Sequence, residues 1–463
     1  MMLASDTIAA IATPPGAGAI GIIRLSGPDA VPIADACFHG KRLGEQASHT
    51  IHFGTLRDEQ GRILDEVLVS LFIAPKSYTG EDVVEVSCHG SHYILEEALR
   101  LFLRRGARLA QPGEFTLRAF LNGRMDLSQA EAVADLIASA SAASHRLAIQ
   151  QLRGGVSEEI RRLRQELLDF ASLIELELDF SEEDVEFADR SQLHNLLDRV
   201  RSLIRSLLDS FQFGNAIRQG VSTVIAGRPN AGKSTLLNAL LNEERAIVSE
   251  IAGTTRDTIE ETLHISGVSF RIIDTAGIRE AHDAIEAIGV ERTFEKVRQS
   301  AVLLYVFDAA RCSPEQVRQD IAQLLHPDLR VLVVANKIDL APSADFARFF
   351  PNPDSPVDAT QWVPISASLR TNLEVLKEKL YALVVREDLP LDGAVLSNAR
   401  HYEALYQALE SIEEAARGLY AGIPSDLIAM DIRRALHYLG EITGEVSVED
   451  LLGNIFGKFC IGK

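Results

Sequence analysis

A glycine-rich segment, G-R-P-N-A-G-K-S at residues 227–234, holds the side chains whose type and spacing point most directly to chemistry. It matches the pattern G-x-x-x-x-G-K-[ST], with an apolar run before it and the helix-forming run T-L-L-N-A-L-L after it. Glycines allow backbone N–H groups to turn inward around phosphate oxygens, and the N-terminus of a helix adds positive partial charge. We therefore expect Lys233 to reach the β- and γ-phosphates of a nucleotide and Ser234 to bind Mg²⁺.

Two later loops are expected to complete the phosphate and magnesium site. D-T-A-G, at 274–277, follows an apolar run, so Asp274 is expected to face the magnesium and Gly277 to lie at the γ-phosphate. T-T, at 254–255, lies between these segments, where Thr255 is expected to complete the coordination of the metal.

Base recognition is expected from N-K-I-D at 336–339 and S-A-S at 366–368. Asp339 would accept two hydrogen bonds from guanine, and a site built to pair those donors strongly rejects a base that lacks them. A backbone N–H of S-A-S would bind the guanine carbonyl. Four motifs in this order predict a GTPase domain. The residues expected to contact the nucleotide are Asn230, Ala231, Gly232, Lys233, Ser234, Thr235, Thr255, Asp274, Thr275, Ala276, Gly277, Asn336, Lys337, Asp339, Ser366, Ala367 and Ser368.

These motifs leave the means of hydrolysis open. Ile278 follows D-T-A-G, where Ras-like enzymes have the glutamine that orients the attacking water. Glu286 is a candidate for that task. Three other carboxylates compete with it: Glu280, Asp283 and Glu291. From the sequence alone, the more ordinary interpretation of each of the four is a solvated carboxylate on a helix. The transferred phosphoryl group also needs a cation, either an arginine finger, worth roughly 10³–10⁵ in rate, or a monovalent cation held by the side-chain carbonyl of Asn230.

These loops need a rigid frame, and residues 217–385 predict one. Short Val- and Ile-rich runs alternate there with helical segments, which is typical of a buried and mainly parallel sheet in an α/β domain. The runs lie at 221–227, 269–274, 301–309 and 331–337. P-N-P-D-S-P, at 351–356, predicts a loop within this domain.

Residues 1–120 predict a separate α+β domain. Its expected elements are a strand at 19–27, a hairpin at 50–74, a strand at 83–90 and a helix at 91–105 closed by Gly106. We therefore expect a mixed α+β domain that precedes the helical and GTPase domains.

The remaining segments, 121–216 and 386–463, predict a helical domain into which the GTPase domain is inserted. The Ala-rich run 126–144 is expected to be helical, and the acidic run 175–187 is expected to be the solvated end of a helix. A further helix is expected from 191 to about 212. Apolar residues recur at helical spacing at Ile160, Leu163, Leu167, Phe170 and Ile174.

Composition limits the class of protein. A chain of 463 residues exceeds one ordinary domain, and 46% hydrophobic with 24% charged residues is typical of a soluble globular protein. No run approaches about 18 apolar residues, no signal peptide is visible, and no C-x-x-C pair occurs among the cysteines, so we expect a protein of a reducing cytoplasm. The net charge of −20 implies that any nucleic acid would be bound through a local patch or a partner.

The whole chain resembles the MnmE (TrmE) family of tRNA modification GTPases. The GTPase motifs alone indicate only a GTPase, whereas the flanking segments and the C-terminal tetrapeptide are specific to this family. The segments that carry the resemblance are P-P-G-A-G-A-I-G-I-I-R-L-S-G (14–27), Y-T-G-E-D-V-V-E-V-S-C-H-G (78–90), P-G-E-F-T-L-R-A-F-L-N-G-R-M-D-L-S-Q-A-E-A (112–132), I-A-G-T-T-R-D (251–257) and C-I-G-K (460–463).

The resemblance implies a folate-binding domain at 1–120 that forms a homodimer, a helical domain at 121–216 and 386–463, and an inserted GTPase domain at 217–385. It implies a flavoprotein partner, MnmG (GidA), which contains FAD. With that partner, members place an aminomethyl-type group (carboxymethylaminomethyl) on C5 of the wobble uridine of certain tRNAs. The one-carbon unit comes from 5-formyltetrahydrofolate or a related tetrahydrofolate. Potassium promotes G-domain pairing and GTP hydrolysis, and no membrane is involved.

The resemblance also implies roles for individual residues. Glu286 would orient the attacking water, Ser234 and Thr255 would bind magnesium, and potassium would be held by Asn230, Ser249, Ile251 and Thr254. Folate would contact Arg24, Glu81, Arg124 and Lys463. A pterin needs a carboxylate acceptor and the glutamyl tail of folate needs cations, which this set supplies. From the sequence alone, Arg24 and Glu81 are equally well explained as an ordinary ion pair, and Arg124 stands where other members can carry lysine, so its geometry differs.

Cys460 is fourth from the end of the chain, the position of a prenylated cysteine, but I-G-K fits that signal poorly. An inert thiol and a catalytic thiol both remain open, and a reactive thiol would need its pKa lowered by Lys458 or Lys463.

A regulatory or ribosome-assembly GTPase without modification chemistry is the alternative function.

Overall fold

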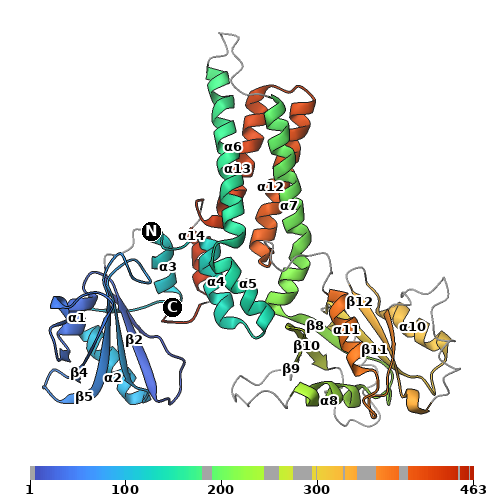
Figure 1. Ribbon diagram of the computed structural model, residues 1–463, viewed down its shortest axis with the longest axis horizontal. Helices are drawn as coiled ribbons and strands as arrows, with labels where there is room; N and C mark the ends of the chain where they lie inside the picture. Colours follow the sequence, from blue (N-terminus) through green and yellow to red (C-terminus); the bar gives the residue numbers. More distant parts are fainter. Residues whose placement is uncertain are drawn as a thin grey trace. The chain divides into compact units, whose positions relative to one another are not determined.

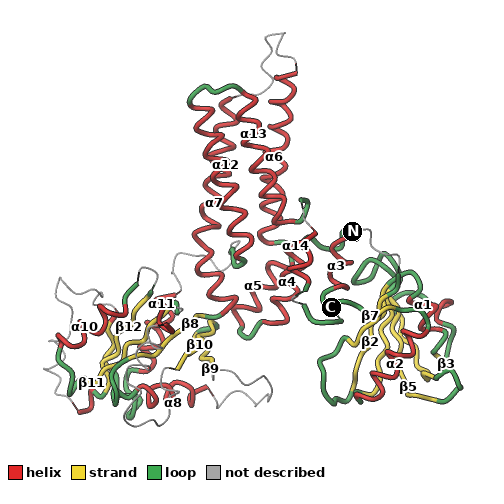
Figure 2. Tube along the Cα trace, turned by 180° about the vertical axis from the view of Figure 1, so that it is seen from behind, coloured by secondary structure: helices red, strands yellow, loops and turns green. Residues whose placement is uncertain are grey.

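The computed structural model describes residues 6–179, 190–244, 260–274, 295–298, 300–326, 329–340, 361–384, 395–446, 449–457 and 459–462. The chain divides into two compact units. The first contains Met1–Ile137, Gln150–Arg201 and Gln407–Lys463, and the second contains Ala138–Ile149 and Ser202–Tyr406. Figures 1 and 2 show the elements from two opposite sides. Among the helices that the structure describes, none has the length and apolar character needed to cross a membrane.

The first unit contains a seven-stranded sheet with the strand order β3-β4-β5-β6-β2-β1-β7. Neighbouring strands are antiparallel except β1 and β7, which are parallel. The hairpin expected at 50–74 and the strands expected at 19–27 and 83–90 are confirmed. The strands are β1 (Ile8–Ile11), β2 (Ile20–Ser26), β3 (Phe38–His39), β4 (Thr50–Arg57), β5 (Ile63–Phe72), β6 (Val83–His89) and β7 (Arg108–Leu109).

The two faces of this sheet differ in character because successive strand side chains point to opposite sides. Helices α1 (Ala30–Asp35) and α2 (His92–Arg104) pack with one face and close an apolar core. On the other face, the register places Phe53 opposite Leu68, Leu68 opposite Ser87, and Ser87 opposite Ile22. We call this the outer sheet face. Large apolar side chains that are exposed on it are Ile20, Ile51, Phe53 and Leu68.

Helices make up the rest of the first unit. Helix α6 (Gly155–Asp179) packs along α13 (Ser425–Thr443), and the apolar stripe predicted from Ile160 to Ile174 is buried as expected. The expected acidic helix end reaches Asp179, and residues 180–187 lie outside the described residues. The other helices of this unit are α3 (Glu114–Leu121), α4 (Leu127–Ala138) and α14 (Glu449–Phe456).

The Ala-rich run 126–144 forms two helices where one was expected: α4 ends at Ala138 and α5 (Ala142–Leu152) begins after a break. The break has a local cause. Backbone N–H of Ser144 donates to Oγ of Ser141 at 3.1 Å, and backbone N–H of Ser141 donates to Oγ of Ser144 at 3.0 Å. Reciprocal bonds of this kind satisfy the free N–H groups at a helix start, so they begin a new helix.

The second unit contains a six-stranded sheet with the order β13-β12-β11-β8-β10-β9, parallel except for the β9–β10 hairpin. The predicted α/β domain is therefore confirmed, although the loop predicted at 351–356 lies outside the described residues. The strands are β8 (Val221–Ala226), β9 (Glu260–Ile265), β10 (Val268–Asp274), β11 (Val302–Asp308), β12 (Arg330–Asn336) and β13 (Trp362–Pro364).

Apolar clusters cover both faces of this sheet, which is why its strands are nearly continuous apolar runs. Helices of this unit include α8 (Lys233–Glu244), α10 (Pro314–Leu324) and α11 (Leu373–Val384). Two long helices, α7 (Arg190–Gln219) and α12 (Ala399–Tyr420), contribute residues to both units. The helices predicted after residue 190 and after residue 390 are thus present.

Candidate functional site

The phosphate loop, which we define as residues 227–234, connects β8 to α8 and has the backbone that its glycines predict. Gly227 and Gly232 have φ values of 146° and 92°, in the region that favours glycine. A Cβ atom on Gly227 would lie 1.9 Å from the carbonyl oxygen of Val306, and one on Gly232 would lie 2.3 Å from Nδ2 of Asn336. Only glycine fits at these two positions.

Lys233 bends back over the phosphate loop. Its Nζ donates hydrogen bonds to the carbonyl oxygens of Gly227, at 2.8 Å, and Arg228, at 3.0 Å. Ser234 and Thr235, at the start of α8, are exposed. The ammonium group and two hydroxyl groups therefore lie at the N-terminal end of a helix, the arrangement that binds phosphate and a hard cation.

Asn336, at the end of β12, joins three of the predicted motifs. Its Nδ2 donates to the carbonyl oxygen of Ala231 at 2.9 Å, and its Oδ1 accepts from the backbone N–H groups of Lys337, at 2.9 Å, and Ala367, at 3.0 Å. The side chain is 2% exposed. Because all these bonds lie in a buried place, N-K-I-D and S-A-S are held against the phosphate loop in one arrangement.

Lys337 adds a second connection to the phosphate loop. Its Nζ donates to the carbonyl oxygen of Asn230 at 2.7 Å and forms an ion pair with Oδ2 of Asp308 at 2.8 Å. Asp308, at the end of β11, is buried, whereas Asp339 is exposed in a short helix at Ile338–Leu340. Asp339, the carboxylate expected to bind the base, is thus accessible. Asp308, which sequence reasoning missed, holds Lys337 in place through the ion pair.

The S-A-S segment follows β13. Ser366 is fully buried, Ala367 is 4% exposed and Ser368 is exposed, and the two serine hydroxyl groups lie 3.1 Å apart. The backbone of this segment is therefore fixed beside N-K-I-D, as base recognition requires.

Several predicted residues lie outside the described part of the chain, so the structure does not place them. For Asp274, the end of β10 is described but the side chain is not. The residues outside are Ser249, Ile251, Thr254, Thr255, Thr275, Ala276, Gly277, Glu280, Asp283, Glu286, Glu291, Lys458 and Lys463.

A second constellation surrounds Arg24 on the outer sheet face. Its guanidinium group forms an ion pair with Glu85, with Nη2 at 2.7 Å and Nε at 2.8 Å from Oε1. It also lies 5.4 Å from the ring centre of Tyr78 and 5.6 Å from that of Phe115, within the range of a cation–π interaction. Nη1 donates to the carbonyl oxygen of Gly462 at 3.4 Å.

Glu81 has a different partner from the one considered on the sequence. It accepts from Oγ of Ser26 at 2.7 Å and from Nη1 of Arg118 at 3.2 Å. Arg24 and Glu81 therefore do not form an ion pair with each other. Arg124, the other predicted folate residue in the described part, is exposed, and its Cγ atom would lie 3.3 Å from a Cβ atom on Gly80.

Arg118 is the central charge of this region, and its side chain is only 1% exposed. Besides Glu81 it contacts Asp6 at 2.7 Å and Glu114 at 3.1 Å. Burial alone would raise the pKa of Glu114, but hydrogen bonds from Arg108, from the backbone of Gln111 and from Arg118 outweigh it and hold the pKa below its ordinary value.

The C-terminal tail packs against the start of the chain. Gly462 has a φ of 100°, and a Cβ atom on it would lie 2.5 Å from the carbonyl oxygen of Ile11. Backbone N–H of Gly113 donates to the carbonyl oxygen of Cys460 at 3.4 Å. Cys460 itself is exposed. The predicted proximity of the tail to Arg24 is therefore present, through the main chain of Gly462.

Sequence reasoning missed the partners that surround Arg24 and Glu81. All of these partners lie within the segments that carry the family resemblance: Tyr78, Glu85, Phe115 and Arg118. Their positions signalled that the segments matter. No spacing rule indicated which charge pairs with which, because the partners come from different strands and helices.

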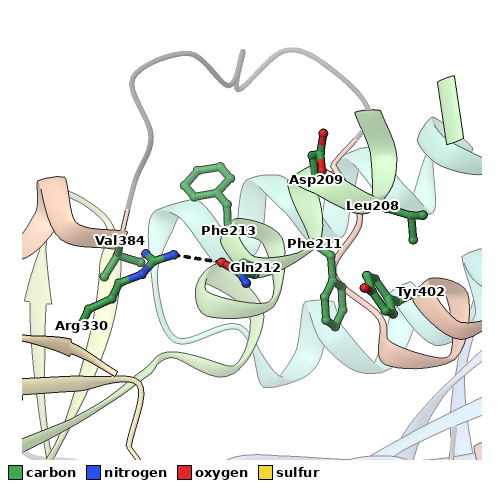
Figure 3. Close-up of a pocket in the computed structure, with 8 residues that line it drawn as sticks. All are labelled: Leu208, Asp209, Phe211, Gln212, Phe213, Arg330, Val384 and Tyr402. Carbon is green, nitrogen blue, oxygen red and sulfur yellow. Dashed lines mark hydrogen bonds between the residues drawn. The ribbon is translucent and has the colours of Figure 1, made fainter. Parts of the chain in front are cut away.

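The second unit also contains a pocket of about 450 Å³ where α7, β12, α11 and α12 meet. Figure 3 shows Arg330 reaching Gln212, with Nη2 donating to Oε1 at 3.0 Å, while the rings of Phe211 and Tyr402 lie 4.6 Å apart. None of the residues predicted to contact a ligand lines this pocket. Its lining residues are Leu208, Asp209, Phe211, Gln212, Phe213, Arg330, Val384 and Tyr402.

Comparisons with known proteins address the whole chain. A model of the MnmE helical domain matches residues 127–460, and a model of the GTP-binding protein TrmE N-terminus matches residues 7–124. The tRNA modification GTPase MnmE of Cytophaga hutchinsonii is 54% identical over 99% of this chain and 98% of that protein. The protein of the same name from Christiangramia forsetii is 53% identical over 100% of both chains.

Among solved structures, an Era protein of Aquifex aeolicus is 28% identical over 41% of this chain and 66% of that chain. With a TM-score of 0.28, this likeness carries no weight. The family of this chain is shown instead by the two domain models and the full-length relatives. This chain belongs to the family of tRNA modification GTPases named MnmE.

Proposed function

We propose that this chain binds guanine nucleotides, hydrolyses GTP and takes part in the modification of tRNA. Family membership supports the reaction, and the arrangement of Asn336 supports the site: one buried amide connects the phosphate loop to both base-recognition motifs. The enzyme is thus a GTP hydrolase whose triphosphate would lie on the phosphate loop, with Lys233 at its β- and γ-phosphates.

Base selection is tested by changing Asp339. Asp339→Asn would replace an acceptor by a mixed donor and acceptor, so guanine would lose its pair while xanthine would gain one. We expect GDP affinity to fall by at least about 10²-fold and XDP affinity to rise, measured by equilibrium binding. Glu374→Gln is a matched control, because Glu374 is an exposed carboxylate on α11 of the same unit. Unchanged GDP affinity in Asp339→Asn would contradict this assignment.

The metal ions and the hydrolytic group belong to the same proposal. Ser234 and Thr255 would bind Mg²⁺, and Asn230, Ser249, Ile251 and Thr254 would hold K⁺. Two members of this set support the proposal: Ser234 and Asn230 are exposed at the phosphate loop, and the carbonyl oxygen of Asn230 is taken by Lys337. The side-chain carbonyl of Asn230 would therefore meet the cation. Glu286 would orient the attacking water.

Potassium dependence is measured as the GTPase rate in potassium against sodium. We expect a faster reaction and association of two GTPase domains in potassium, and Asn230→Ala should remove most of the difference. Equal rates in the two salts for the unchanged protein would remove the cation from the mechanism.

The constellation around Arg24 supports binding of a tetrahydrofolate by Arg24, Glu81, Arg124 and Lys463. Arg24 presents a cation beside the faces of Tyr78 and Phe115, and a flat pterin ring stacks favourably on such surfaces. Titration with 5-formyltetrahydrofolate tests this directly. Arg24→Ala should weaken binding about tenfold or more, in line with the loss of a charge-assisted contact, and should leave the GTPase rate unchanged.

The outer sheet face supports homodimerisation through the N-terminal domain, because it exposes a group of large apolar side chains: Ile20, Ile51, Phe53 and Leu68. Phe53→Asp would place a charge in that group and should give monomers in sedimentation analysis. Tyr93→Asp is the matched control, because Tyr93 is an exposed aromatic residue on α2. If this variant stays dimeric, the effect of Phe53→Asp is specific to the outer sheet face.

The modification itself would require the FAD-containing partner MnmG, with the product at C5 of the wobble uridine and the one-carbon unit taken from folate. Nucleoside mass spectrometry on tRNA incubated with both proteins, GTP, folate and potassium tests this. Cys460→Ser should abolish the product and retain GTP hydrolysis if the exposed thiol takes part. Unmodified tRNA in the complete reaction would instead favour a GTPase with another cellular task.

A further inference from the structure

Arg228, the second residue of the phosphate loop, makes a contact that the proposed nucleotide chemistry does not use. Its Nε and Nη2 donate to Oδ2 and Oδ1 of Asp320, at 2.7 and 3.0 Å. Asp320 lies on α10, outside all four nucleotide motifs. Two parallel N–H···O bonds between a guanidinium and a carboxylate fix both distance and orientation.

A buried hydroxyl group secures the same carboxylate from the sheet. Tyr305, on β11, is 1% exposed, and its hydroxyl donates to Oδ2 of Asp320 at 2.5 Å. The side chains of Arg228 and Asp320 are 39% and 25% exposed, so the ion pair is partly shielded from water. Burial alone would raise the pKa of Asp320, but the bonds from Arg228 and Tyr305 outweigh it and hold the pKa below its ordinary value.

Arg228 links this ion pair to the group that would meet the phosphates. Its guanidinium binds Asp320, while its carbonyl oxygen accepts from Nζ of Lys233 at 3.0 Å. The other part of the loop is held by Asn336 at Ala231 and by Lys337 at Asn230. The loop is therefore anchored by side chains from β11 and α10 on one side and from β12 on the other.

We propose that Asp320 and Tyr305 are positioning residues that, through Arg228, hold the phosphate loop in its nucleotide-binding conformation. A loop ordered before binding loses less conformational freedom when the phosphates arrive, which raises affinity. Two of the three guanidinium nitrogens donate to Asp320, so the role assigned to Arg228 is exerted through the backbone of the loop. This inference rests on the proposed binding of GTP.

The test is a double-mutant cycle on nucleotide binding. Fluorescent GDP affinity and dissociation rate are measured for the unchanged protein, Arg228→Met, Asp320→Asn and the double variant. We expect each single variant to bind GDP about tenfold more weakly, mainly through faster dissociation, and the double variant to lose little more than either single one. Tyr305→Phe should give a smaller loss in the same direction.

Steady-state kinetics separate positioning from a general structural role. Because bound GTP would itself order the loop, loosening the free loop should raise KM for GTP several-fold and leave kcat, which depends on the bound loop with Lys233 in place, within about twofold. Arg228→Lys, which keeps the charge but not the paired geometry, should fall between the unchanged protein and Arg228→Met.

A matched control lies on the same helix. Arg318 and Glu315 form an exposed ion pair on α10, so Glu315→Gln should leave GDP affinity unchanged. GDP affinity within twofold of the unchanged protein in both single variants, or strictly additive losses in the double variant, would overturn the inference. Equal losses of kcat with unchanged KM would overturn it as well. Failure of the unchanged protein to bind GDP would refute the proposed function instead.

Discussion

The nucleotide site and the region around Arg24 are built from the chain in different ways. In the nucleotide site, each functional group belongs to a short motif, and the motifs meet through backbone carbonyl and N–H groups, as at Asn336. Around Arg24, one side chain meets groups that are distant along the chain: the carboxylate of Glu85 lies 61 residues away and the carbonyl oxygen of Gly462 lies 438 residues away.

The difference follows from the two sheets. In a mainly parallel sheet, loops at the carboxyl ends of adjacent strands lie at one edge, so the topology brings motifs together. In the antiparallel sheet, the register decides which residues face each other, and a shift by one residue would reverse every side chain. Substitutions in the two regions should therefore affect different properties of the protein, and four experiments test that difference.

The largest expected effect concerns the stability of the first unit. Arg118→Met would remove the buried cation that Asp6, Glu81 and Glu114 share. Asp6 and Glu114 would keep their ion pairs with Arg108, so we expect a loss near the lower end of the range of about 3–5 kcal/mol for a broken buried ion pair. Trp362, the one tryptophan of the chain, lies in the second unit and reports on that unit alone. Urea unfolding should show an earlier circular-dichroism transition and an unchanged fluorescence transition. A coincident shift of both signals would mean that the units unfold together.

The second effect concerns catalysis. Lys233→Ala should lower the GTPase rate about 10²–10³-fold, because one charge that stabilises the transferred phosphoryl group is lost. Folate binding in this variant should stay within twofold of the unchanged protein. In the reverse experiment, Arg24→Ala should lower only folate affinity. A folate defect in Lys233→Ala would show that the two regions are coupled in the isolated protein.

The third effect is the response to acid. Burial alone would raise the pKa of Asp6, but hydrogen bonds from Arg108 and Arg118 outweigh it, so its pKa is lowered. A carboxyl group with a lowered pKa in the folded state stabilises the fold above its ordinary value, here 3.8, and this contribution is lost as the pH falls through the folded value. Stability of the first unit should therefore fall below about pH 4.

Arg118→Met is the control for that acid response. Without Arg118, the pKa values of Asp6 and Glu114 should move part of the way back up, because Arg108 keeps its bonds to both carboxylates. The urea midpoint of the variant should therefore depend somewhat less on pH between about 4 and 2. A midpoint that falls with acid as steeply in the variant as in the unchanged protein would assign the acid sensitivity to other carboxylates.

The smallest effect concerns the tail. Gly462→Ala would place a Cβ atom 2.5 Å from the carbonyl oxygen of Ile11 at a φ of 100°, a strain of about 1–3 kcal/mol that the tail can relieve by moving away. Folate affinity should fall a few-fold and GTP hydrolysis should not change. Gly453→Ala is the matched control, because a Cβ atom on this exposed glycine of α14 would meet open space. Equal folate affinity in both variants would remove the tail from the folate site.

Local patterns were enough to predict most of the elements. The strands at 19–27 and 83–90, the hairpin at 50–74 and the buried stripe from Ile160 to Ile174 are present as expected. The Ala-rich run 126–144 was predicted as continuous, and the reciprocal serine bonds that divide it depend on two side chains three residues apart. Bonds from serine side chains to the backbone compete with the backbone hydrogen bonds of a continuous helix, and the spacing of apolar residues does not reveal which will form.

The phosphate loop, the order of the nucleotide motifs and the family could be predicted without coordinates, because each depends on residues that are neighbours along the chain. The ion pairs of Arg24 with Glu85, of Arg118 with Glu81 and of Arg228 with Asp320 could be found only in the folded molecule. The physical reason is one of range. Glycine conformation and helix starts are set by local sterics and hydrogen bonds. The partner of a charged side chain depends instead on which strands and helices bring opposite charges within about 3 Å of each other in a place partly shielded from water.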